Sequence, residues 1–335
     1  MQAGGENAGI EEGREAVEFF HNPRVDWLGK KWYFLAFSLI FSVAGVISMG
    51  WHMAHIGSPV PLGVDFQGGT QVQVRFFQHP NISQIREAMD AAGVHDARIV
   101  QFGEAANNDL LISLPETKNE NALDAGREKI DSALGKQYAG QFTIRNVQVV
   151  GPTVGRQLEK QAALATLYSL IGMLIYLWFR FQLIYGVAAV VACFHDTLIT
   201  LGAFALAERE LSLTVIAAIL TLVGYSMNDT IVVFDRIREN LRLSRREPLA
   251  DLVNRSINQT LSRTVLTSGL TFLTVLSLFI FGGQVLNGFS FALVIGILIG
   301  TYSSIAVASP MLVAWQEYRA GHGKAAVLPA AKRSR

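Results

Sequence analysis

The sequence predicts a polytopic α-helical membrane protein with six transmembrane helices and one α+β domain outside the membrane. Half of the 335 residues are hydrophobic and 16% are charged, whereas soluble globular proteins carry about a quarter charged residues. Six apolar runs are long enough to cross a hydrocarbon core of about 30 Å. After the first run the composition becomes that of a soluble protein, from Gly57 to about Lys160. These three observations predict a helical bundle that carries one separate folded domain.

The first apolar run begins the membrane part of the chain. Residues 1–30 are polar and mixed in charge, unlike the short basic start of a cleavable signal peptide, so we expect a cytoplasmic segment there. Residues 31–53 are too long for a signal-peptide core and are expected to form the first transmembrane helix. The outer domain is assigned to residues 54–160 and a five-helix bundle to residues 161–316. The helices of this bundle are expected at about 162–179, 183–207, 211–234, 264–281 and 288–315.

Arginines in the links between the helices indicate the orientation. Arg180 lies in the tight link between the second and third predicted helices. The link between the fourth and fifth helices holds Arg236, Arg238, Arg242, Arg245, Arg246 and Arg255. Because positively charged loops stay on the cytoplasmic side, we expect an inner-membrane protein with both termini in the cytoplasm and residues 54–160 in the periplasm. The tail, residues 317–335, is rich in Ala, Lys and Arg and is expected to be cytoplasmic and disordered.

Sequence patterns within the outer domain predict the order βαββαβ. Helical spacing over Asn81–Ala92 begins at an Asn or Ser cap, and a second helix is expected over Asn119–Leu134. The strands are expected at Thr70–Phe77, Ala97–Phe102, Asp109–Leu114 and Gln141–Val150. This order is a split βαβ, or ferredoxin-like, pattern.

Composition limits the classes of function. The net charge of +1 argues against a nucleic-acid partner. Cys193 is the single cysteine, so an intrachain disulfide is excluded, and we expect it to pack as a small hydrophobic side chain. The sequence has no GxxxxGK[ST] pattern, so we expect neither nucleotide hydrolysis nor another enzymatic activity, and no cofactor. His52 and His55 are only two candidate metal ligands, and because protein metal sites usually need three or four, no metal is expected.

Polar residues inside the apolar runs are the candidate functional site. Asp196 lies midway along the third predicted helix, and Asn228 and Asp229 lie in the inner half of the fourth. A carboxyl group at this depth costs about 2.5–3.5 kcal/mol, so it is expected to face the bundle interior and to mark an ion path. Helical spacing predicts three polar faces: Cys193, Asp196, Thr197 and Thr200; Thr221, Tyr225, Asn228 and Asp229; and Arg263, Thr267, Thr271 and Thr274. We expect the three faces to line one hydrated seam; alternatively, the acids pair with an arginine or with backbone donors and hold the helices together.

Two other features have structural interpretations. Asp235 and Arg236 are expected at the membrane surface, where charges cost little. The sixth predicted helix carries a small residue at every fourth position, namely Ala292, Gly296, Gly300, Ser304 and Ala308. Such a strip lets another helix approach closely, so Gly296 and Gly300 are predicted to be helix-packing residues.

Four motifs resemble those of a known family. Residues 224–240, GYSMNDTIVVFDRIREN, resemble the signature of the SecF family within the resistance-nodulation-division superfamily. Residues 63–70, GVDFQGGT, residues 150–155, VGPTVG, and the pair His195-Asp196 match the same family, and the similarity runs from about residue 20 to residue 315. The matching motif positions include Asp65, Gly68, Gly69, Gly224, Asp235 and Arg236. The glycines at 68 and 69 are also explained by a turn that only glycine permits.

The resemblance implies a role in protein export. A member of this family pairs with SecD, a second six-helix half, and assists the SecYEG channel and the associated YajC and YidC proteins in moving preproteins across the inner membrane with the proton motive force. By the same matching, Asp229 is implied to carry the proton, Arg263 to lie beside it, and Asp196 and Asn228 to be further polar members of the site. Membrane lipid is the remaining expected partner.

A mechanism follows from the implied role. One charge that crosses 100 mV yields about 2.3 kcal/mol, and protonation of Asp229 would weaken its attraction to Arg263 and let the helices repack. Because transporters of this superfamily are built from two halves, we also expect Gly296 and Gly300 to contact SecD. The alternatives are a half-size efflux transporter of the same superfamily and a non-transporting assembly subunit, and coupling to sodium instead of protons stays open.

Overall fold

The computed structural model describes residues 23, 25–94, 97–102, 108–114, 125–181, 183–244 and 247–322. The predicted cytoplasmic segment up to residue 22 and the predicted disordered tail beyond residue 322 lie outside the described residues. The same applies to Arg245, Arg246 and the first part of the helix expected over Asn119–Leu134.

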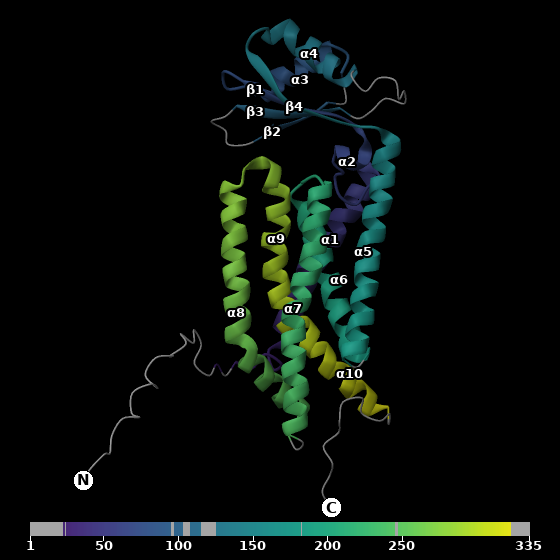
Figure 1. The fold of residues 1–335 in the computed structure, drawn as a ribbon, viewed down its shortest axis with the longest axis vertical. Coiled ribbons are helices and arrows are strands. Elements are labelled where there is room, and N and C mark those ends of the chain that lie inside the picture. The colour runs from purple at the N-terminus through teal and green to yellow at the C-terminus, as the bar shows by residue number, and fades with distance from the viewer. Residues whose placement is uncertain are drawn as a thin grey trace, which may run out of the picture.

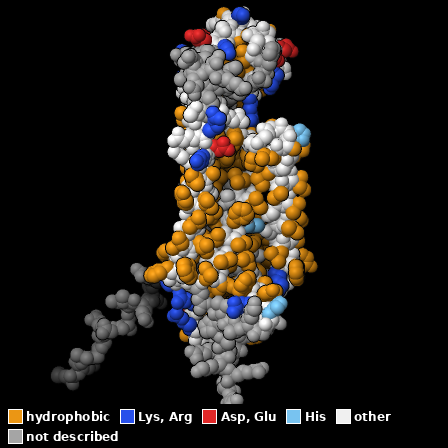
Figure 2. Space-filling model, turned by 90° about the vertical axis from the view of Figure 1, so that its right-hand side faces the viewer, with side chains coloured by type: hydrophobic (Ala, Val, Ile, Leu, Met, Phe, Trp, Pro, Cys, Tyr) orange, Lys and Arg blue, Asp and Glu red, His pale blue; other side chains and the backbone are white. Residues whose placement is uncertain are grey.

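Six helices of the described chain are long and apolar enough to cross a membrane, which confirms the predicted architecture. The α+β domain lies over one end of the bundle (Figure 1). Five of the spans are single helices: α1 Lys31–Ile56, α5 Pro152–Arg180, α6 Leu183–Leu206, α7 Leu213–Leu243 and α8 Leu249–Phe281. The sixth is composite, with α9 Gly283–Ser303, a π-helical turn η3 Ser304–Ala308, and α10 Ser309–Gly321. Figure 2 shows a band of hydrophobic side chains on the visible face of the helices, with Lys and Arg side chains above and below it.

Several helices continue beyond the predicted apolar runs. Helix α5 begins at Pro152, where proline at the first helical position follows the extended Gly151. Helix α7 continues to Leu243 and α8 begins at Leu249. An apolar run marks the part of a helix that suits lipid, whereas backbone hydrogen bonding continues into polar residues. For this reason hydropathy gave the number of helices but not their ends.

The α+β domain has the predicted ferredoxin-like order, with all neighbouring strands antiparallel and the sheet order β2-β3-β1-β4. Its elements are β1 Gly69–Phe76, α3 Ile82–Ala91, β2 Arg98–Phe102, β3 Asp109–Leu114, α4 Ala125–Tyr138 and β4 Phe142–Val150. The carboxamide of Asn81 accepts hydrogen bonds from the backbone N–H groups of Ser83 and Gln84, which confirms the predicted cap. Helices α3 and α4 cover one face of the sheet, and the other face is turned toward the bundle (Figure 1).

The domain is joined to the bundle by backbone pairing as well as by the helices α1 and α5. The N–H of Gly63 donates to the carbonyl of Leu211 at 2.8 Å, and the N–H of Leu211 donates to Pro61 at 2.7 Å. Gly63 lies just before the short helix α2, Val64–Gln67, and Leu211 lies just before α7. The segment after the first span is therefore hydrogen-bonded directly to the loop that precedes the fourth.

Glycines bring the membrane helices into close contact within this chain. A Cβ atom added at Gly296 would lie 2.3 Å from the side chain of Leu222 on α7, and one at Gly300 would lie 3.0 Å from Ser226 on the same helix. The strip is therefore used for packing inside the bundle, and the prediction that these two glycines contact SecD is wrong. A second close crossing joins α1 and α6, because a Cβ at Gly202 would lie 2.6 Å from the Cα of Gly45.

Candidate functional site: two carboxylates in the bundle and a joint to the outer domain

Asp196 lies at the centre of the bundle and has no exposed surface. One of its oxygens, Oδ2, accepts hydrogen bonds from Ser226 of α7 at 2.5 Å and from Ser303 of α9 at 2.7 Å. The other oxygen, Oδ1, lies 3.0 Å from Nδ1 of His195. Helices α6, α7 and α9 are therefore connected through one carboxylate.

His195 extends this connection to the first helix. Its Nε2 atom lies 2.5 Å from the hydroxyl of Ser38 on α1. An Nδ1–H donated to Asp196 leaves Nε2 of a neutral ring free to accept the Ser38 hydroxyl. A polar chain thus runs from α1 through His195 and Asp196 to α9.

The π-helical turn places two more serines against this chain of groups. Ser303 ends α9 and donates to Asp196, and Ser304 begins the turn and shares a hydrogen bond of 2.9 Å with Thr230 of α7. The hydroxyl of Ser309 donates to the carbonyl of Ser304 at 2.9 Å, across the wider turn. Such turns are frequent at functional sites. Sequence reasoning missed Ser226 and Ser303 and gave Ser304 only a packing role; small hydroxyl residues within apolar spans were the available signal.

Asp229 is also buried but has a smaller set of partners. It is 3% exposed, and the hydroxyl of Ser268 on α8 donates to its Oδ2 at 2.6 Å. Arg263 lies on the exposed face of α8. Among the described residues no ion pair within 4 Å includes Arg263.

Most of the other predicted polar residues of α7 and α8 lie on the outside of this chain, and Tyr225 and Thr271 are half-buried. Asn228 and Thr221 are exposed, whereas Asp229 is buried, so the prediction that Asp229 shares their face is wrong. Consecutive helical residues point about 100° apart, which separates residue 228 from residue 229. Thr267 and Thr274 are exposed on α8, and the hydroxyl of Tyr225 reaches the carbonyl of Thr267 at 3.4 Å. The three predicted faces therefore do not line one seam. Asp196 and its hydrogen-bond partners form a buried group, the closed centre, whereas the exposed residues Thr221, Asn228, Arg263 and Thr267 form an open polar face on α7 and α8.

The motif around Asp65 forms the joint between the domain and the bundle. Asp65 Oδ2 accepts the N–H of Leu213, the first residue of α7, at 2.9 Å, and Oδ1 accepts the amide of Gln148 on β4 at 2.8 Å. Gly68 and Gly69 have φ angles of 76° and 123°, which favour glycine strongly. The glycines thus satisfy the predicted turn, and the carboxylate ties one strand of the domain to the start of α7.

A second contact between domain and bundle surrounds Glu210 in the α6–α7 loop. Arg98 of β2 lies 3.2 Å from the Glu210 carboxylate and donates to the carbonyl of Glu208 at 3.2 Å. Burial raises the pKa of Glu210, and the charge of Arg98 partly offsets that rise. A cleft of about 810 Å³ lies beside this contact, between the open face of the sheet and the outer loops. The amide side chains along the cleft are Gln71, Gln73, Gln101, Asn146 and Gln148 from the domain and Asn287 from α9.

Arg209 connects the α6–α7 loop to α9. It donates to the side chain of Asn287, and its guanidinium carbon lies 4.2 Å from the centroid of the Phe291 ring. Burial lowers the pKa of Arg209, although an arginine stays charged at physiological pH. The loop before α7 is therefore held to the first turns of α9 beneath the domain. In the described part of the chain no group of three or more His, Cys, Asp or Glu residues could hold a metal ion.

Comparisons with known proteins identify the class to which this fold and these motifs belong. Residues 130–318 match the family described as protein export membrane protein SecD/SecF, C-terminal, and residues 56–76 match the SecD/SecF GG motif. The class is therefore that of multi-pass membrane subunits of protein export. The chain belongs to the SecD/SecF family and, within it, to the protein translocase subunits of the SecF type.

The similarity to known SecF and SecDF proteins extends over most of the chain. The chain is 55% identical to the protein translocase subunit SecF of Koribacter versatilis, over 93% of this chain and 96% of that protein. It is 44% identical to the SecF subunit of Desulfurispirillum indicum, over 90% and 93% of the two chains. The crystal structure of SecDF, a translocon-associated membrane protein from Thermus thermophilus, matches with a TM-score of 0.76 and 38% identity, over 88% of this chain. This chain covers 39% of that longer SecDF chain, so it corresponds to one part of it.

Proposed function

We propose that this subunit pairs with SecD and that the pair uses the proton motive force to assist preprotein translocation through SecYEG, together with YajC and YidC. The observation that carries the proposal is the position of Asp229: a buried carboxyl group with a single described hydrogen-bond donor, next to an open polar face. A membrane carboxylate of this kind is a candidate for proton exchange.

The open polar face on α7 and α8 is evidence that a second protein half covers this side of the bundle. Arg263, Asn228, Thr221 and Thr267 are exposed on the surface of the described chain. Polar and charged side chains at membrane depth normally face protein or a water-filled cavity, so contact with lipid alone would be costly. The solved SecDF chain, of which this chain covers 39%, contains additional protein. We assign SecD as the cover of this face because transporters built from two halves place their sites between them.

The connection from Asp229 to the outer domain supports a mechanical role. Helix α7 carries Asp229, and its first residue, Leu213, is hydrogen-bonded to Asp65 of the domain joint. Protonation of Asp229 removes its attraction to Arg263 and lets α7 shift against α8. Because α7 begins at the joint, the shift would be transmitted to β4 through Asp65 and Gln148. A movement of β4 would also change the shape of the amide-lined cleft under the sheet, because Gln148 lines it.

The orientation belongs to the same proposal. The last turns of α5 and α7 and the first turns of α8 carry the positive charges Arg180, Arg236, Arg238, Arg242 and Arg255. Because positively charged segments stay on the cytoplasmic side, this charge distribution supports a cytoplasmic location for that end of the bundle and a periplasmic location for the domain. Protons would then enter from the side of the domain. The relatives are named as translocase subunits, which favours export over the efflux and assembly alternatives.

The test is the substitution Asp229→Asn, which keeps the shape of the side chain but removes the exchangeable proton. Membrane vesicles that contain the variant, SecD and SecYEG should complete preprotein translocation without stimulation by an imposed proton gradient, a loss of about tenfold or more in the stimulated rate. Asp235→Asn is the matched control, because Asp235 is exposed near the membrane surface. A variant stimulated as strongly as the parent would overturn the role of Asp229, and stimulation of the parent by sodium alone would replace the proton as the coupling ion.

A further inference from the structure

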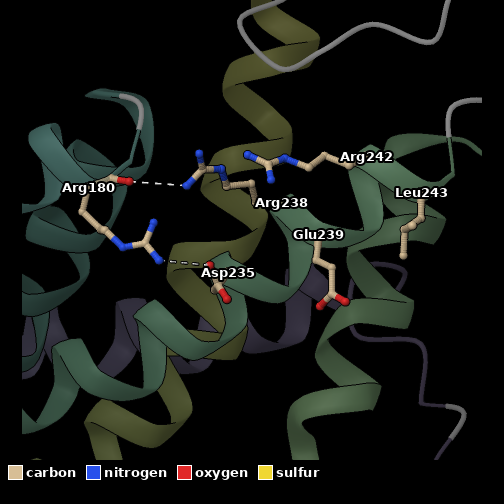
Figure 3. A pocket seen from close by; sticks show the side chains of 6 residues that line it. All are labelled: Arg180, Asp235, Arg238, Glu239, Arg242 and Leu243. Atoms are coloured by element: carbon tan, nitrogen blue, oxygen red, sulfur yellow. Dashed lines mark hydrogen bonds and ion pairs between the residues drawn. The ribbon is translucent and has the colours of Figure 1, made fainter.

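Three arginines converge on a cavity at the end of the bundle away from the α+β domain. The cavity has a volume of about 360 Å³. Arg180 reaches it from the last residue of α5, and Arg238 and Arg242 reach it from the last turns of α7 (Figure 3). Asp235, Glu239 and Leu243 complete its lining.

The acids of the cavity do not neutralise two of these arginines. Asp235 lies 4.0 Å from Arg180, and the carboxylate of Glu239 accepts a hydrogen bond from Arg236 at 2.7 Å. In the described part of the chain no carboxylate lies within 4 Å of the guanidinium of Arg238 or of Arg242. Arg238 is directed into the cavity by a hydrogen bond of 3.4 Å to the carbonyl of Arg180 (Figure 3).

Two neighbouring guanidinium groups repel each other unless an anion lies between them. Each offers a planar set of N–H donors that matches the oxygens of a phosphate group in a bidentate way. An anion with a phosphate group would therefore reduce the repulsion and satisfy donors that no described acid meets.

The surface next to the cavity is apolar. Phe179 is 92% exposed, Leu243 is 74% exposed, and Leu183 is 53% exposed. Phe179 precedes Arg180, Leu183 begins α6, and Leu243 lines the cavity itself. A free anion leaves these side chains uncovered, whereas acyl chains would cover them. Cytoplasmic basic pockets between transmembrane helices are known to bind the headgroups of anionic lipids.

We propose that this cavity binds the phosphate of an anionic phospholipid, with Arg238 and Arg242 as the main ligands, Arg180 at the rim, and the acyl chains against Phe179, Leu183 and Leu243. The site differs from the carboxylates of the bundle and is independent of the ion-coupling mechanism. A simpler role for the arginines is to set the orientation of the chain, which lysine performs as well as arginine. A substitution of arginine by lysine should therefore weaken phosphate binding but leave the orientation of the chain unchanged.

The experiment measures lipid retention by the purified full-length chain in mild detergent, using native mass spectrometry with phosphatidylglycerol and phosphatidylcholine. The parent should retain phosphatidylglycerol preferentially. The double variant Arg238→Gln, Arg242→Gln should lose about fivefold in preference per arginine. The double variant Arg238→Lys, Arg242→Lys keeps the charge and the orientation but should still lose at least about threefold, because an ammonium group cannot bind bidentately.

The control is Arg255→Lys, which changes an arginine that lies outside the cavity and pairs with Glu247, also outside it. It should keep the preference of the parent. If the double lysine variant elutes as misfolded protein, Arg242→Lys alone replaces it, since Arg242 is exposed. The proposal is overturned if the lysine variant keeps the full preference, if the parent shows none, or if inorganic phosphate displaces phosphatidylglycerol, because the site would then bind free phosphate.

Discussion

The two membrane carboxylates lie in contrasting surroundings. Asp196 contacts donors from three helices, Ser226, Ser303 and His195, and is linked through His195 to a fourth. Asp229 receives one hydrogen bond, from Ser268, and lies beside an open polar face. Both side chains are almost completely buried, so burial alone does not distinguish them. The number of hydrogen-bond donors distinguishes them. A carboxylate with several donors connects helices, whereas a carboxylate with few donors can change its protonation state and disturb fewer hydrogen bonds.

The largest effect that would test this contrast is on the stability of the isolated chain. Asp196→Ala leaves two hydroxyls and an imidazole without their acceptor, and we expect a loss of about 2–3 kcal/mol in the free energy of unfolding. Asp229→Ala leaves only the hydroxyl of Ser268, so we expect a loss of about 1 kcal/mol or less. Thermal unfolding of the purified chain in detergent would measure both. Equal losses would remove the distinction between a connecting and a titrating carboxylate.

The closed centre also depends on the crossing of α1 and α6. A Cβ at Gly45 would lie 2.9 Å from the Cα of Gly202, whereas one at Gly50, on the same helix, would meet no atom within 4 Å. Gly45→Ala should therefore cost about 1–3 kcal/mol through overpacking, because backbone atoms must move. Gly50→Ala is the matched control and should leave the unfolding midpoint unchanged or slightly raised. Similar midpoints for the two variants would show that the crossing is loose.

The open face should respond to partner binding more than to folding. Thr267→Leu changes an exposed residue next to Arg263, so we expect little change in the stability of the chain alone. Co-purification with SecD should fall by about fivefold, or roughly 1 kcal/mol of binding. Leu270→Ile, also exposed on α8, is the control and should retain binding. Gly296→Leu should do the opposite, lowering stability through its contact with Leu222, and a selective loss of SecD in that variant would reverse the assignment of the interface.

The smallest effect is expected for a carboxylate in the aqueous domain. Arg75 donates to both oxygens of Asp109 at 2.7 Å, and this guanidinium lowers the pKa of Asp109. Because the pKa is lower in the folded than in the unfolded state, the pair stabilises the domain above about pH 4 and loses that contribution as the pH falls through the folded-state pKa. Asp109→Asn should therefore speed hydrogen exchange in β1 and β3 at neutral pH and have no effect at the acidic end. A difference that persists at low pH would contradict the ion-pair explanation.

Local patterns predicted the elements of the molecule because their causes are local. The six spans follow from runs of apolar side chains, and the ferredoxin-like order follows from the alternation of strands and from the Asn81 cap. The motif positions Gly68 and Gly69 were predicted as a turn that requires glycine, and both have positive φ angles. Each of these features depends on residues close together in the chain.

The placement of polar groups across helices could not be predicted in the same way. Helical spacing put Asn228 and Asp229 on one face, but only the packing of α7 against its neighbours decided that Asp229 points inward and Asn228 outward. The same packing turned the small-residue strip of α9 toward Leu222 and Ser226 of this chain. The residue pattern of one helix does not specify which neighbouring helix will pack against each of its faces.

The sequence by itself determined the number of spans, the domain order, the family and the acids that lie at membrane depth. Only the tertiary structure decided which donors those acids meet: Ser226 and Ser303 for Asp196, and Ser268 for Asp229. Residues 196, 226 and 303 come from three separate helices, and serines are common enough that no local pattern marks these particular ones. Hydropathy and helical period describe one helix at a time, whereas a hydrogen-bonded site inside a bundle depends on how several helices rotate and approach one another.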